Sequence, residues 1–263
     1  MMDPRQDMNS LFVYAKFQAI VSLPRIQPYI KVTGNKQKAV GLYTWNKAVS
    51  GAFMPLLQAA EISLRNAIQT PAQVKFNNPM WIRPLVEHLN APKSQDKYKY
   101  LLGEIDKAES KLRRQNKKIS IDGIIANLTF GFWVELLTNR FNDPRNNQML
   151  WPALIGDVFP NAKHKNLKIF HQHYNEIRDL RNRISHHETV WPKSVGDQYD
   201  DILRHLNRLI DIVEECIEYH SQEYSCLLKA NGFDSILRGL CTNASLQSYV
   251  MSFDSNALIK WSL

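Results

Sequence analysis

The stretch LKIFHQHYNEIRDLRNRISHHETVW (167–191) combines a strong helical pattern with the densest group of polar side chains in the sequence. Its apolar residues recur every three or four positions, as they do on the buried face of an α-helix. These residues are Leu167, Phe170, Tyr174, Ile177, Leu180 and Ile184. The stretch therefore predicts a packed helix whose C-terminal end carries Arg, Asn and His side chains.

Two further stretches show the same periodicity. One apolar face consists of Val49, Phe53, Leu56, Ala60, Leu64 and Ile68. It predicts a helix of about 30 residues, with Pro71 as its stop. The other consists of Tyr199, Ile202, Leu206, Leu209, Val213 and Ile217. Acidic residues that suit a helix N-terminus open it: Asp197, Asp200 and Asp201. Alternating strand patterns and Asn-Gly or Asp-Gly hairpin turns are missing, so the sequence predicts an all-α fold with a less regular tail after about residue 225.

Length and composition are those of an ordinary globular protein: 263 residues, 44% hydrophobic and 22% charged. No apolar run approaches the ~20 residues of a membrane-spanning helix, and the N-terminus lacks the pattern of a secretory signal. The cysteines are few and widely spaced, which predicts buried free thiols in a reducing compartment: Cys216, Cys226 and Cys241. We therefore expect a cytoplasmic protein.

Positive charge is concentrated in residues 93–118, which hold nine Lys or Arg against four Asp or Glu, in a chain of net charge +8. Such a segment favours binding to polyanions such as RNA, although a solvated helical face explains the charge equally well. Tyr98 and Tyr100 lie among the lysines and favour RNA slightly, because aromatic rings stack on unpaired bases. The candidate RNA-binding residues are Lys97, Lys99, Lys111, Arg113, Arg114, Lys117 and Lys118, with Arg178 and Arg183 from the polar stretch.

The geometry of the polar stretch poses a conflict. On an ideal helix Arg181 falls within the apolar stripe, whereas Asn182 and His186 line another face. Arg181 and His186 are then about 140° apart, which is poor geometry for joint chemistry. Either the helix ends near Ser185 and the histidines swing round, or two copies meet in a dimer and complete each other's sites.

The side chains suit phosphate chemistry. An imidazole such as that of His186 transfers protons near neutral pH, and the guanidinium of Arg181 stabilises a phosphoryl transition state. Together with Asn182 they suit attack of an RNA 2′-hydroxyl on the adjacent phosphate, and we expect no metal or cofactor. His171 and His173 point apart on a helix, so zinc is not expected there. A structural hydrogen-bond network that caps the helix explains the same residues.

Three blocks in this sequence resemble the Abi-like proteins (abortive infection, AbiD/AbiF-type) of the HEPN superfamily. LRNRISHHETVW (180–191) resembles the family's C-terminal Arg-x(4–6)-His signature. YTWNKAVSGAFMPLLQAAEISLRNAI (43–68) resembles its N-terminal helix, and LTFGFWVELLTNRF (128–141) its central block, which LWPALIGDVFP (150–160) follows. The blocks occur in the family's order within residues 40–192.

The resemblance implies an all-α, HEPN-like helical bundle with additional helices at both ends, in a homodimer with metal-independent endoribonuclease activity. Carried over by position, Arg181 and His186 are catalytic and Asn182 orients, with His187 as the next candidate. In the N-terminal block, Glu61, Arg65 and Asn66 match a trio expected to play a supporting, structural role.

Residues 1–225 are expected to form the Abi-like domain and residues 226–263 a C-terminal helical extension. The biological role implied is that of a toxin that acts during phage attack and is silenced by an antitoxin, for which a noncoding RNA is a candidate. The alternative is a non-catalytic RNA-binding homodimer that serves as a sensor or scaffold. In that case a change of His186 weakens RNA binding modestly and abolishes nothing else.

Overall fold

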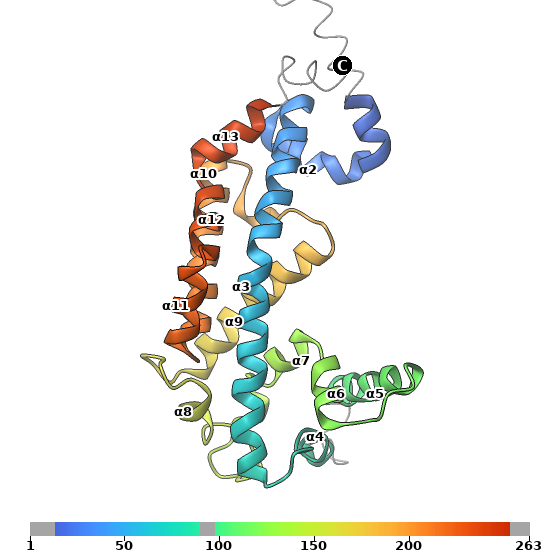
Figure 1. The fold of residues 1–263 in the computed structure, drawn as a ribbon, viewed down its shortest axis with the longest axis vertical. Helices are drawn as coiled ribbons and strands as arrows, with labels where there is room; N and C mark the ends of the chain where they lie inside the picture. Colours follow the sequence, from blue (N-terminus) through green and yellow to red (C-terminus); the bar gives the residue numbers. More distant parts are fainter. Residues whose placement is uncertain (1–13, 90–97, 253–263) are drawn as a thin grey trace, which may run out of the picture. The chain divides into compact units, whose positions relative to one another are not determined.

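The computed structural model describes residues 14–89 and 98–252, and these residues form helices joined by turns and loops (Figure 1). No strand occurs among them, apart from an isolated bridge between Asn142 and Trp151, which confirms the predicted all-α class. The α-helices are α2 (Leu23–Thr33), α3 (Lys36–Phe76), α4 (Ile82–Leu89), α5 (Lys99–Arg114), α6 (Ile121–Asn127), α7 (Phe130–Glu135), α8 (Ile155–Val158), α9 (Leu167–Ser185), α10 (Tyr199–Glu218), α11 (Gln222–Ala230), α12 (Phe233–Leu240) and α13 (Asn243–Ser252). Two short 3₁₀ helices are η1 (Asn139–Phe141) and η2 (Lys193–Val195). None of the helices in the described part of the chain has the length and apolar character needed to cross a membrane.

The chain forms two compact units. Unit 1 contains the described residues of 1–57, 179–213 and 226–263, and unit 2 contains those of 58–178 and 214–225. Helices α3, α9, α10 and α11 each have residues in both units. The chain after residue 225 is regular rather than irregular as far as it is described, because α11, α12 and α13 follow one another up to Ser252.

The three predicted apolar faces are buried. In α3 every predicted member is at most 1% exposed, and in α9 none exceeds 8%. In α10 only Tyr199, at the first position of the helix, is half-exposed. Asp200 and Asp201 lie in the first turn of α10, as expected from the favourable interaction of carboxylates with a helix N-terminus.

Pro71 does not end α3, and the prediction of a stop there was wrong. The helix continues to Phe76 and is 41 residues long. Proline removes one backbone hydrogen bond, but contacts of the last turns offset this loss. Ala72 is fully buried, Phe76 stacks on Trp81, and Gln69 accepts a hydrogen bond of 2.9 Å from the Trp81 indole.

The core of unit 1 includes an aromatic cluster. Trp191 contacts Tyr29 edge-on and Trp45 at a tilt, with ring centroids 5.9 and 6.2 Å apart. All three rings are at most 4% exposed. Close packing of α3 and α13 adds to this core, because a Cβ on Gly41 would lie 2.2 Å from the Tyr249 carbonyl oxygen. Trp191 thus anchors the segment that follows α9.

The core of unit 2 includes a buried polar chain. His220 Nδ1 lies 2.7 Å from the Val158 carbonyl oxygen, and its Nε2 lies 2.6 Å from the Tyr174 hydroxyl. Burial lowers the pKa of His220 to about 4, so this imidazole is neutral at physiological pH. The neutral ring donates to Val158 and accepts from Tyr174, which satisfies both nitrogens.

Candidate functional site

The polar stretch identified in the sequence lies where α9 ends. The amides of the three residues after Ser185 bond backwards: His186 to Asn182 O (2.9 Å), His187 to Ile184 O (3.0 Å) and Glu188 to Arg183 O (2.9 Å). This is the Schellman pattern, in which the residue after the helix takes a left-handed conformation. His187 occupies that position with a φ of +58°, a conformation that costs about 1–2 kcal/mol for a residue with a side chain.

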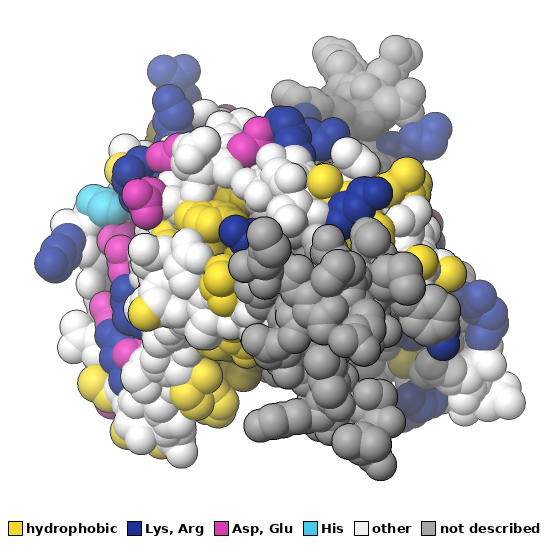
Figure 2. All heavy atoms as spheres, turned by 90° about the horizontal axis from the view of Figure 1, so that it is seen from above, with side chains coloured by type: hydrophobic (Ala, Val, Ile, Leu, Met, Phe, Trp, Pro, Cys, Tyr) yellow, Lys and Arg dark blue, Asp and Glu magenta, His cyan; other side chains and the backbone are white. Residues whose placement is uncertain are grey.

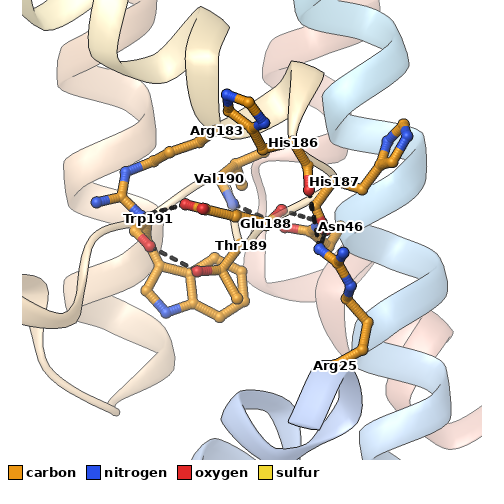
Figure 3. A network of polar contacts seen from close by, with 9 residues as sticks. All are labelled: Arg25, Asn46, Arg183, His186, His187, Glu188, Thr189, Val190 and Trp191. Atoms are coloured by element: carbon orange, nitrogen blue, oxygen red, sulfur yellow. Dashed lines mark hydrogen bonds and ion pairs between the residues drawn. The ribbon is translucent and has the colours of Figure 1, made fainter. Parts of the chain in front are cut away.

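Two residues from distant parts of unit 1 hold the backbone of this turn (Figure 3). Arg25 Nη1 donates to the carbonyl oxygens of His186 and His187, each at 2.8 Å. A cation is favourable here because carbonyls at a helix C-terminus carry partial negative charge. Asn46, which is fully buried, donates to Glu188 O (3.2 Å) and accepts from Val190 N (2.9 Å).

These contacts involve the backbone of the two histidines and not their imidazole rings. His186 and His187 are exposed, and their rings project away from the hydrogen-bonded network in different directions (Figure 3). Among the described residues neither ring has a hydrogen-bond partner. The turn therefore has a fixed backbone and two histidine side chains that are accessible to a ligand.

The structure settles part of the geometric conflict between Arg181 and His186. Helix α9 does end at Ser185, but the bond from His186 N to Asn182 O keeps His186 in the helical register. Only His187 leaves the helix direction. Arg181 is half-buried, and its Nη1 lies 3.4 Å from the side-chain oxygen of Asn182. Asn182 thus contacts Arg181 within the chain, and its expected orienting action on His186 stays a prediction.

Arg183 also lies near the turn and pairs with Glu188 at 3.4 Å.

Asn46 and Arg25 were not among the predicted site residues. Asn46 could have been found, because it lies three residues before Val49 on the apolar face of α3, where a polar side chain needs a partner. Nothing in the sequence near Arg25 indicates its role, since its contacts are 161 and 162 residues away.

The predicted basic segment forms α5 and the turn after it. The cationic residues expected to bind RNA are exposed: Lys99, Lys111, Arg113, Arg114, Lys117 and Lys118. Lys97 lies outside the described residues, and Arg178 is half-buried in α9. Tyr98 is only 5% exposed and its hydroxyl donates to Arg140 O, so the expected stacking role is open to Tyr100 (56% exposed) but not to Tyr98.

One face of the molecule carries no continuous basic patch (Figure 2). On the face drawn in Figure 2, lysine and arginine side chains stand at several separate places among acidic and uncharged ones. The exposed cations of α5 and of the following turn belong to unit 2.

The expected supporting trio lies on α3 in unit 2. Arg65 Nε donates to the Asn66 side-chain oxygen at 3.2 Å, the same kind of neighbour contact that joins Arg181 to Asn182. Glu61, one helical turn before Arg65, is half-exposed.

A family model described as Abi-like protein matches residues 13–192, which is more than half of the chain. The match includes Arg25, Asn46 and the whole turn at the end of α9. No curated protein and no solved structure matches the chain. The chain thus belongs to the Abi-like protein family, as its sequence blocks had indicated.

Proposed function

We propose that this Abi-like protein is a metal-independent endoribonuclease that acts as a toxin in abortive infection, a form of phage defence. The observation that carries the proposal is the turn after α9, where two imidazoles are exposed on a backbone held by Arg25 and Asn46. Family membership supports the setting of phage defence.

In the proposed reaction His186 removes the proton from a ribose 2′-hydroxyl, and the resulting oxygen attacks the adjacent phosphorus. Arg181 stabilises the additional negative charge on the phosphate oxygens. The P–O5′ bond breaks, the leaving 5′-oxygen takes a proton from an imidazolium or from water, and a 2′,3′-cyclic phosphate forms. His187 is the candidate for that acid. The exposed cations of α5 supply general affinity for RNA.

The proposal includes a homodimer. Because His186 keeps the helical register of α9, Arg181 and His186 of one chain stay about 140° apart around the helix. A second copy would supply the missing partner, so that Arg181 of one chain acts with His186 of the other. An antitoxin, with a noncoding RNA as the candidate, would keep the enzyme silent in uninfected cells.

Growth of expressing cells tests the proposal. Wild-type protein should slow bacterial growth, and His186→Ala should remove the effect, whereas His88→Ala, a change at an exposed histidine of α4, should not. Full growth inhibition by His186→Ala at equal protein level would rule out His186 chemistry as its cause.

Co-expression tests the shared site. If Arg181 and His186 act across the dimer, an Arg181→Ala chain and a His186→Ala chain together rebuild one complete site, and cleavage returns in part. If each chain holds its own site, the mixture stays inactive, which would contradict the dimer arrangement.

A further inference from the structure

A pocket of about 590 Å³ opens beside His187, entirely within unit 1. Its wall comes from three segments: the start of α2, the turn after α9 and the start of η2. This volume falls in the range of small-molecule sites, roughly 300–1,000 Å³, and suits one nucleotide.

The pocket wall is cationic. It contains Arg25, Arg183 and Lys193 but one carboxylate, Glu188, which pairs with Arg183. Arg25 uses a single nitrogen for both of its carbonyl contacts, so Nε and Nη2 keep their donors. Lys193 is exposed and has no ion pair among the described residues.

The charge of Arg25 also acts on a lysine of α3. Burial and the nearby charge of Arg25 lower the pKa of Lys47, which lies over the Tyr43 ring. An anion bound at Arg25 in the pocket would offset the charge that lowers this pKa. The geometry therefore favours a phosphate-bearing ligand over a cationic or neutral one.

Tyr29 supplies a second, independent sign of a ligand. It lines the pocket, is 1% exposed, and its hydroxyl has no hydrogen-bond partner among the described residues. A buried hydroxyl without a partner is costly. The Tyr29 oxygen is covered by protein atoms, so a ligand oxygen bonds to it, and recovers that cost, only after a small shift of the pocket wall. Pro24 and Pro28 add an apolar wall against which a ribose or base can pack.

We infer that this pocket binds the phosphate and ribose of a nucleotide, with Lys193 and Arg25 on the phosphate and Tyr29 on a ligand oxygen. The inference rests on the proposed function in one respect: it assigns the pocket to the RNA nucleotide next to the cleaved bond. Binding itself does not depend on cleavage, so the two can fail separately.

The test measures binding of a 2′-O-methylated RNA oligonucleotide, which cannot be cleaved through its 2′ position, and of a nucleoside 5′-monophosphate. Lys193→Gln should weaken RNA binding roughly tenfold at low salt and lower the slope of log K against log salt by about 0.7. Lys163→Gln, the same change at an exposed lysine of unit 2, is the matched control.

Tyr29→Phe removes only a hydroxyl, so it should leave the fold intact and weaken binding a few-fold. Loss of monophosphate binding in both variants would identify the nucleotide itself as the ligand, and loss with the oligonucleotide alone would identify the RNA strand. The inference is overturned if Lys193→Gln and Tyr29→Phe both bind as the wild type and the control do. Cleavage that fails in a protein with intact pocket binding would refute the proposed function alone.

Discussion

Asn46→Ala tests whether the side chain of Asn46 holds the backbone of the turn after α9. The substitution removes the hydrogen bonds to Glu188 O and Val190 N, which the fully buried amide makes at 3.2 and 2.9 Å. Val190 is 1% exposed, so its amide would lose its partner away from water, whereas Glu188 is exposed and its carbonyl can turn to solvent. One full penalty of about 1–3 kcal/mol, and about half of that for the second group, predict a loss of about 1.5–4.5 kcal/mol.

Two measurements check this prediction. Urea unfolding gives the change in the free energy of unfolding, and hydrogen exchange of the segment 188–195 reports on the turn itself. Exchange at Val190 should accelerate strongly in Asn46→Ala. It should remain slow in Asn231→Ala, where the side chain donates to Leu227 O of the adjoining α11. A loss below about 0.5 kcal/mol, within the usual range of surface changes, together with unchanged exchange at Val190, would show that Asn46 does not hold the turn.

Three further predictions concern stability and RNA affinity. Burial lowers the pKa of His220 from 6.5 to about 4, so the unfolded chain takes up a proton first as the pH falls. The free energy of unfolding is therefore not reduced by His220 above pH 6.5, and it falls by about 3 kcal/mol as the pH drops towards 4. Urea unfolding at both pH values should show a smaller fall in His220→Phe. Gly41→Ala should destabilise by at least about 1–3 kcal/mol, because its Cβ would meet the backbone of α13, whereas Gly51→Ala, with open space around it, should stabilise by up to about 1 kcal/mol in thermal unfolding. Lys111→Gln with Lys117→Gln should lower the salt slope of RNA binding by about 1.4, and an unchanged slope would remove α5 from the RNA interface.

The helices could be predicted where burial follows a local period. The apolar residues of α3 and α9 are buried as predicted, because a helix places residues three and four positions apart on the same face and this spacing can be read from the sequence. Pro71 shows the limit of such local rules. A proline predicts a helix end, but α3 continues because the packing of Gln69 and Phe76 against Trp81 lies outside any local pattern.

The sequence predicted the side chains of the candidate site but not the residues that hold the backbone of the turn. Arg181, Asn182 and the two histidines form a recognisable cluster within a few residues. Arg25 and Asn46 contact the same turn from more than 140 residues away, so their role depends on tertiary structure. Tyr98 failed as a stacking residue for the same reason, because its burial comes from contacts with Phe141 and Arg140.

Metal-independent cleavage is tested by incubating the purified protein with total bacterial RNA in EDTA and mapping the new ends. We expect cleavage by the wild type and by His88→Ala, with 2′,3′-cyclic phosphates at the upstream ends, and no cleavage by His186→Ala. Cleavage by the doubly substituted His186→Ala/His187→Ala protein at the wild-type rate would contradict this expectation, because no imidazole of the turn would then take part.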